Sequence, residues 1–243
     1  RGLIISATDS LARWAGTPLR DLVADGLAAR LGARIPVHVQ NDVDAHAHGE
    51  LRYGAARGAD SALVIAVGTG IGGGVVIDGA VRRGAHHVAG EIAHVPTPGA
   101  EHLRCPCGRP GHLEAIGSGV GLHRHYAWLG GTVAADGREV AALAAAGDPL
   151  AARAVQDSAA AIARGIVSAV TVLDPALVVV TGSVAAAGPL WWAALRETFA
   201  AEAIDVLQSV PLVAGELGGD AALLGAAASA WELVGAGAAD GDT

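Results

Sequence analysis

The spacing of apolar and polar positions along the first quarter of the chain predicts two helices separated by a strand. Apolar residues recur at helical spacing over 18–31, with proline at the first turn and glycine directly after the last. A strand is expected over 36–40, and a second helix is expected to run through 42–53. Asn41 and Asp42 therefore stand where a strand delivers side chains to a site.

A continuous apolar run over 62–67 begins a different pattern. The glycine-rich stretch 68–74, a short strand over 75–77 and the dipeptide Asp78-Gly79 follow it. This order predicts strand, glycine turn, strand and tight hairpin. The dinucleotide-binding fingerprint requires a helix directly after its glycines, so a Rossmann fold is disfavoured. The turn is either an ordinary glycine-rich connection or a place where successive N–H groups approach an anion.

Periodicity fails over 84–119, where His, Cys, Pro and Gly accumulate. A long irregular loop needs a stabiliser other than regular hydrogen bonding, and a metal ion is the obvious one. Helix and strand patterns resume after it, over 148–173 (helix), 176–180 (strand), 189–199 (helix), 210–213 (strand) and 221–234 (helix), with a flexible tail expected at 235–243.

Composition narrows the class of protein. The 243 residues are 52% hydrophobic, which is enough for a large core, and their formal net charge of -8 argues against nucleic-acid binding by this segment. The most apolar stretch, 159–180, is interrupted by Arg164 and Asp174, so no membrane span is expected. The chain starts at Arg1 and contains no Met, so it is expected to be an internal piece of a longer protein. Its two Cys lie only two positions apart and are poorly placed for a structural disulfide, which favours the reducing cytoplasm.

Four side chains in the irregular loop have the spacing of a metal site. Cys105 and Cys107 lie at one tight turn, with His112 five residues after Cys107 and His94 eleven residues before Cys105. Two thiolates and two imidazoles suit tetrahedral Zn²⁺, and four protein ligands indicate a structural rather than a catalytic ion. The alternative is that the two Cys are small core residues.

Carboxylates and an amide gather on either side of this loop. Asn41, Asp42, Glu91, His94 and Glu114 together offer the donors and acceptors that vicinal hydroxyls need, although each alone could be a solvated surface group. Phosphoryl transfer to a hydroxyl needs a base beside it and N–H groups around the phosphates. Asp42 and the glycine turn could supply both.

The loop motif resembles that of the ROK family (repressors, open reading frames and kinases). The family pattern Gly-Glu-x-x-His followed by C-x-C-G-x-x-G-C-x-E is similar to Gly90–His94 and then Cys105–Glu114, with His112 in place of the third family Cys. The resemblance extends in order over almost the whole chain. It implies an α/β fold of the actin-like ATPase (ribonuclease H-like) type, with two lobes and a cleft for ATP and sugar.

The resemblance also implies residue roles. Asp42 would be the catalytic base of an ATP-dependent hexose or N-acetylhexosamine kinase, and His94 would serve both the sugar and the metal. The sugar would contact Asn41, Glu91, His94 and Glu114. ATP with Mg²⁺ would contact Gly68, Thr69, Gly70, Gly72, Gly73, Gly182 and Ser183. Structural Zn²⁺ would be held by His94, Cys105, Cys107 and His112.

One family element does not occur in the sequence. ROK kinases carry an early Asp-x-Gly-Gly-Thr strand that holds phosphates and Mg²⁺, and the 243 residues contain no such segment. Residues 1–57 are therefore expected to be the rest of a small lobe, and 58–220 the large lobe. The chain alone is expected not to turn over. The alternative function is the sugar-sensing domain of a repressor, which would bind DNA through an upstream helix-turn-helix. A homodimer is expected from the resemblance.

Overall fold

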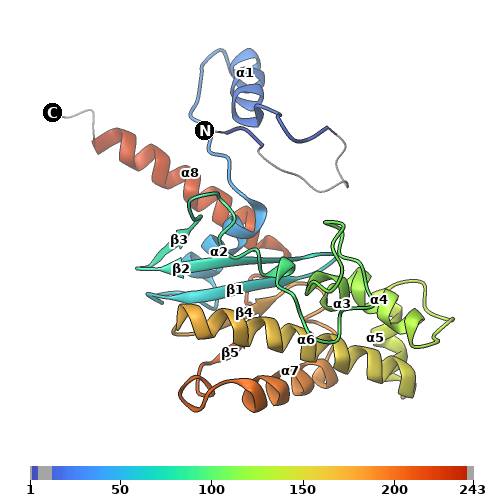
Figure 1. The fold of residues 1–243 in the computed structure, drawn as a ribbon. Coiled ribbons are helices and arrows are strands. Elements are labelled where there is room, and N and C mark those ends of the chain that lie inside the picture. Colours follow the sequence, from blue (N-terminus) through green and yellow to red (C-terminus); the bar gives the residue numbers. More distant parts are fainter. Residues whose placement is uncertain (1, 5–12, 240–243) are drawn as a thin grey trace.

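A computed structural model describes residues 2–4 and 13–239 of the chain. One five-stranded sheet lies between helices on both faces, and α1 stands apart from this layered body (Figure 1). The helices are α1 (Leu19–Leu31), α2 (Asp42–Tyr53), α3 (Glu114–Gly117), α4 (Gly119–Trp128), α5 (Gly137–Ala145), α6 (Pro149–Leu173), α7 (Pro189–Glu202) and α8 (Ala221–Ala239). Short 3-10 turns are η1 (Ile92–His94), η2 (Asp205–Leu207) and η3 (Gly218–Asp220). The strands are β1 (Ala62–Val67), β2 (Ile71–Ile77), β3 (Ala80–Arg82), β4 (Val178–Thr181) and β5 (Leu212–Ala214).

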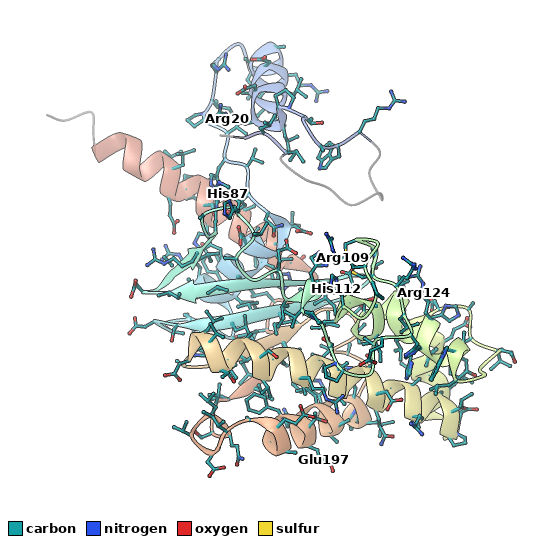
Figure 2. The ribbon with its side chains drawn as sticks, viewed as in Figure 1. Arg20, His87, Arg109, His112, Arg124 and Glu197 are labelled. Carbon is teal, nitrogen blue, oxygen red and sulfur yellow. The ribbon has the colours of Figure 1, made fainter. Side chains whose placement is uncertain are left out.

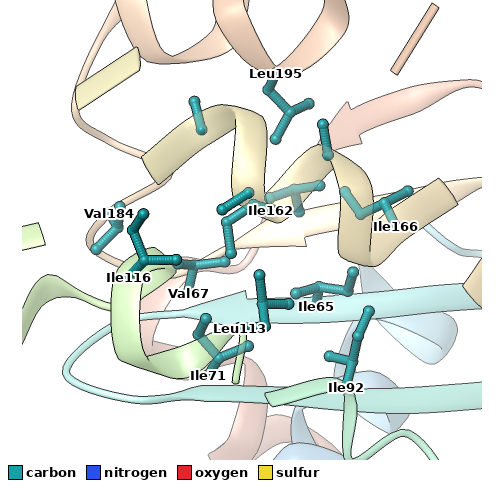
Figure 3. Close-up of a cluster of buried hydrophobic side chains, with 14 of the residues drawn as sticks. Ile65, Val67, Ile71, Ile92, Leu113, Ile116, Ile162, Ile166, Val184 and Leu195 are labelled. Carbon is teal, nitrogen blue, oxygen red and sulfur yellow. The ribbon is translucent and has the colours of Figure 1, made fainter. Parts of the chain in front are cut away.

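The sheet has the order β3-β2-β1-β4-β5 and is mixed. β1 pairs antiparallel with β2 and parallel with β4, and β4 pairs parallel with β5. Side chains of β1 alternate between two cores, as strand geometry requires. Ile65 and Val67 pack with Ile162 of α6 in the larger core (Figure 3). Ala62 and Val64 pack with residues of α2 in the smaller core.

Helix signals in the sequence match the helix ends closely. Gly32 closes α1 in the left-handed conformation, with φ 71°. Asn41 caps α2, and the Asp148 side chain accepts a hydrogen bond from Ala151 N at the start of α6. The hairpin between β2 and β3 turns on Asp78 and Gly79, which both have positive φ, as a type I′ turn requires.

The structure corrects several predicted elements. Residues 36–40 are all described but form no strand, because no neighbouring strand offers them a ladder. The glycine turn is shorter than predicted, since Gly72, Gly73 and Gly74 belong to β2 and pair with β1. Helices α4 and α5 were not predicted.

The last helix continues to Ala239, five residues past its predicted end at 234, and residues 240–243 of the expected tail lie outside the described residues. Within the described residues, no helix combines the length and apolar character needed to cross a membrane.

Candidate active site and metal cluster

Two turns meet at one edge of the sheet because β1 and β4 run in parallel. The turn after β1 holds Gly68, and the turn after β4 holds Gly182. Gly182 has φ 96°, and a side chain there would overlap the carbonyl of Val67. Val184 N donates to the same carbonyl at 2.9 Å. The carboxyl ends of adjacent parallel strands are where open α/β sheets bind ligands.

The N-terminus of α2 faces this edge. Asn41 Oδ1 accepts from Val43 N at 2.8 Å and from Asp44 N at 3.2 Å, which fixes where the helix begins. Asp42 is the first helical residue, and its side chain is exposed. The helix lies directly on β2, where side chains at Gly72 and Gly74 would overlap α2. The glycines of β2 thereby bring Asp42 to the site.

Glu91 reaches the same place through a backbone contact. Gly90 has φ 85°, and a side chain at Gly90 or at Gly73 of β2 would overlap the carbonyl of the other. The loop before η1 therefore rests on β2 backbone to backbone, which only glycine permits. Glu91 follows directly and is exposed.

These segments enclose a cleft of about 300 Å³. Among the predicted site residues it is lined by Asn41, Asp42, Glu91, Gly68, Gly70, Gly72, Gly73 and Gly182. Thr69, His94, Glu114 and Ser183 do not line it. Val43, Asp44, Ala66, Ile71, His87 and Ala89 line it without having been predicted. His87 has φ 59°, unusual for a residue with a side chain, but nothing in a single sequence marks that conformation.

Glu114 supports the cleft from behind. Its Oε2 accepts from Ile71 N at 2.8 Å, where β2 begins after the glycine turn. The same oxygen lies 2.8 Å from the position of a side-chain carbon at Gly70. Glu114 therefore joins α3 to the glycine turn across 43 residues of sequence.

The acidic lining is partly balanced by one arginine. Asp44 is 6% exposed, and Arg83 Nε lies 3.7 Å from its Oδ2. Burial raises the pKa of Asp44, and Arg83 opposes that rise. Arg83 Nη2 also donates to Gln40 Oε1 at 3.1 Å, so it fastens the segment before α2 to the end of β3.

The four predicted metal ligands come together in the irregular loop. Their ligand atoms all lie within 4.8 Å of one another. His94 Nδ1 is 3.6 Å from Cys105 Sγ, and His112 Nδ1 is 3.2 Å from Cys107 Sγ. Ligands at the corners of a zinc tetrahedron are about 3.3–3.8 Å apart, given the usual bond lengths. The donor set and its spacing fit Zn²⁺.

The pKa shifts within the cluster act in both directions. Burial lowers the pKa of His112, which favours the neutral ring that binds metals. Burial raises the pKa of the Cys105 thiol to about 11, whereas a hydrogen bond from the Arg109 backbone lowers the pKa of Cys107. A bound cation would stabilise both thiolates. Figure 2 shows His112 and Arg109 on this loop above α3 and α4, and His87 farther along, over the α2 side of the sheet.

The mixed sheet, with glycine turns at the ends of two adjacent parallel strands and a helix N-terminus facing them, is consistent with the actin-like ATPase fold, which the similar solved structures show. Comparison with known proteins agrees. The ROK family profile matches residues 3–232, and the chain belongs to that family. It is similar to the bifunctional enzyme NanE/NanK of Brucella melitensis, with 36% identity over 83% of this chain and 37% of the relative.

Two solved structures are similar over most of the chain. The ROK family glucokinase of Streptomyces griseus in complex with glucose and AMPPNP superposes with a TM-score of 0.77 and 32% identity, covering 93% of this chain and 77% of that one. A ROK family transcriptional regulator, described as a homologue of the Escherichia coli MLC protein, superposes with a TM-score of 0.74 and 25% identity, covering 88% and 56%. The chain thus spans little over a third of the Brucella enzyme and about three quarters of the glucokinase.

Proposed function

We propose that this chain contributes the catalytic base and the sugar site of an ATP-dependent kinase acting on a hexose or N-acetylhexosamine. One observation carries the proposal: Asn41, Asp42 and Glu91 line the same cleft as the glycine turns after β1 and β4. A sugar hydroxyl bound by these three polar side chains would lie beside phosphates bound by the two glycine turns. The similarity to a glucokinase that binds glucose and AMPPNP supports this choice of substrates.

Asp42 is suited to the role of general base. Its carboxylate is exposed at the start of α2, and its contact at 3.0 Å is with Val43 N of its own helix. It is therefore free to take the proton of a sugar hydroxyl as that oxygen attacks the terminal phosphate of ATP. Backbone N–H groups of Thr69, Gly70 and Gly182 would receive the phosphates, while the Gly68 N–H donates to the Gly70 carbonyl at 2.8 Å and shapes the turn. Thr69 and Ser183 would add hydroxyl donors, and Mg²⁺ would offset phosphate charge.

The remaining sugar contacts surround Glu91. Its Oε2 lies 3.8 Å from His94 Nε2, a separation too long for a direct hydrogen bond but suited to a bridging hydroxyl. Because His94 Nδ1 faces Cys105, one ring nitrogen serves the metal and the other the sugar. Glu114 Oε2 holds the glycine turn, and we assign its other oxygen to the sugar.

We further propose that Zn²⁺ is the structural ion held by His94, Cys105, Cys107 and His112. Bound there, it would tie together a loop that has little regular secondary structure over 84–113. Two free cysteines at such a site fit a reducing compartment, and we propose a cytoplasmic location. The division into a small lobe (1–57) and a large lobe (58–220), and a homodimer, are proposed on the family resemblance.

Replacing Asp42 by Asn tests the proposed chemistry. Asp42→Asn keeps the shape and removes the base, so turnover should fall by about two or more orders of magnitude while sugar affinity changes far less. Turnover is measured on the full-length protein that contains this chain, and sugar binding by calorimetry on the 243 residues. Asp78→Asn, in the hairpin between β2 and β3 and outside the cleft lining, is the matched control, with less than about a tenfold change expected.

The sugar-sensing domain of a repressor is the second candidate, supported by the similarity to a ROK transcriptional regulator. In such a protein Asp42 would contribute to sugar affinity and not to turnover. A full-length protein that transfers no phosphate to any hexose, but releases DNA when a sugar is added, would replace the kinase proposal with this one.

A further inference from the structure

A carboxylate lies buried inside α2, away from the cleft. Glu50 is fully buried, and all of its hydrogen bonds come from backbone N–H groups. Oε2 accepts from Ala55 N at 2.8 Å and from Glu216 N at 3.2 Å, and Oε1 accepts from Leu217 N at 3.1 Å. Burying a carboxylate is costly unless it is fully hydrogen-bonded, so this arrangement needs a reason beyond core packing.

The groups that Glu50 binds belong to the connection between the sheet and the last helix. Residues 215–217 lead from β5 into η3 and α8. A side-chain carbon at Gly215 would lie 2.7 Å from Glu50 Oε1 and 2.7 Å from Thr181 Cβ, so the loop fits only because this residue is glycine. Glu50 therefore fixes where the chain leaves the sheet for α8.

One turn before Glu50, a second side chain of α2 reaches the sheet. His46 Nε2 lies 3.3 Å from Thr181 Oγ1. Thr181 is buried and ends β4, directly before Gly182 of the turn assigned to the nucleotide. Asp42, His46 and Glu50 follow one another at intervals of four residues and so share one face of the helix. That face joins the cleft, the nucleotide turn and the connection to α8.

Helices α2 and α8 pack backbone to backbone at two glycines. A side chain at Gly49 would overlap the carbonyl of Ala221, and one at Gly225 would overlap the carbonyl of Ala45. With no side chains between the backbones at these points, the interface cannot slide without a clash. A shift at either the turn after β4 or the start of α8 is therefore transmitted to α2, which carries Asp42 at its first position.

We propose that His46 and Glu50 are positioning residues that couple the nucleotide turn to Asp42, so that nucleotide and sugar bind cooperatively. This inference rests on the proposed function. A nucleotide seated against the turn at Gly182 orders Thr181 and, through His46, sets the position of α2. Glu50 holds the far end of the helix, so the shift appears at its N-terminus. Asn41 and Asp42 then meet the sugar in one fixed position.

Calorimetric titration of the 243-residue chain tests the coupling without requiring turnover. Glucose and N-acetylmannosamine are titrated with and without saturating AMPPNP, and AMPPNP is titrated with and without the sugar. The wild-type chain should show an increase in sugar affinity of about fivefold or more with AMPPNP, and the same factor in the reverse direction. Glu50→Gln and His46→Leu should reduce that factor toward one, while each ligand alone binds within about threefold of wild type.

Thr181 supplies a pair of variants that separates coupling from packing. Thr181→Val removes the hydroxyl that faces His46 and should lose the coupling, whereas Thr181→Ser keeps a hydroxyl and should retain it. Arg52→Gln is the matched control, because Arg52 joins the same two helices through an exposed ion pair with Glu232 at 3.5 Å. Exposed pairs of this kind contribute little, so its coupling factor should equal that of wild type.

The possible results distinguish this inference from the proposed function. Melting curves identify variants that fail to fold. If Glu50→Gln fails to fold, the comparison of Thr181→Val with Thr181→Ser tests the coupling instead. Undiminished coupling in folded Thr181→Val and His46→Leu overturns the inference while sugar and nucleotide sites stand. A wild-type chain that binds both ligands independently also overturns it. A chain that binds neither glucose, N-acetylmannosamine nor AMPPNP overturns the inference and the proposed function together.

Discussion

The β2 wall of the cleft and the metal loop are built in different ways. On the β2 side, glycines leave the space, with Gly72 and Gly74 against the side chains of Val43 and Ala47 in α2, and Gly73 against the backbone of Gly90. On the loop side, side chains converge, with His94, Cys105, Cys107 and His112 ready to share one ion. The glycine contacts of the β2 wall form as the chain folds, and they leave no space for added side-chain atoms. The metal loop instead depends on the proposed ion, which the chain takes up from solution. Stability experiments can therefore test the β2 wall and the metal loop separately.

Removing the metal should have the largest effect on stability, and it acts on the metal loop. Structural zinc contributes folding free energy directly, so a chelator should cost at least about 3 kcal/mol and lower the Tm by roughly 6–12 °C for a chain of this size. Elemental analysis before and after chelation, combined with melting curves, measures it. The double variant Cys105→Ser and Cys107→Ser should melt at the chelated value and ignore the chelator. Zinc-free wild-type protein with an unchanged Tm would contradict the proposed ion.

A methyl group at Gly90 should be the next most damaging change, and it acts on the β2 wall. Gly90→Ala combines a strained positive φ with overlap of the Gly73 carbonyl, for a loss of about 2–4 kcal/mol in unfolding free energy. Gly99→Ala is the control, because Gly99 has φ 91° with nothing within 4 Å of an added methyl. The difference between the two isolates the backbone contact. Equal losses would show that the contact with Gly73 has no energetic role.

Glu114→Gln should have the smallest effect on stability and the most specific effect on binding. The amide keeps an acceptor for Ile71 N but loses the charge, for a cost of about 1 kcal/mol. If holding the glycine turn is its main task, AMPPNP affinity should fall more than sugar affinity. A larger fall in sugar affinity would favour direct binding of a sugar hydroxyl. Calorimetry with each ligand separates these roles.

Most helices were predictable because capping residues close in sequence mark where they begin or end. Asn41, Asp148 and Gly32 act on neighbours within four residues, so the sequence contains both partners of each contact. The strand expected at 36–40 failed for the opposite reason. Apolar alternation shows that a segment could pair, but pairing requires a partner strand, and none in the described part of the chain lies beside it.

The sequence predicted many residues that line the cleft, but it did not predict all of the contacts that these residues make. Asn41, Asp42 and Glu91 come together as expected, because each stands beside a strand or helix end. The glycines of β2 were expected to approach phosphates, whereas Gly72, Gly73 and Gly74 give room to α2 and to Gly90, contacts made with segments distant in sequence. His46 and Glu50 went unnoticed because their partners, Thr181 and 215–217, lie more than 130 residues away.

The capping role of Asn41 also limits the hydrogen bonds that its side chain can make to a ligand. Its Oδ1 already accepts two backbone N–H groups, so the side chain has only its amide nitrogen left to offer. Asn41 can therefore recognise a lone pair on the sugar but cannot recognise a proton. A fluorinated sugar, which keeps the lone pairs of the replaced hydroxyl and lacks its hydrogen, would satisfy Asn41, whereas the corresponding deoxy sugar would not. The residue that starts the helix thus sets the polarity of one hydrogen bond in the cleft.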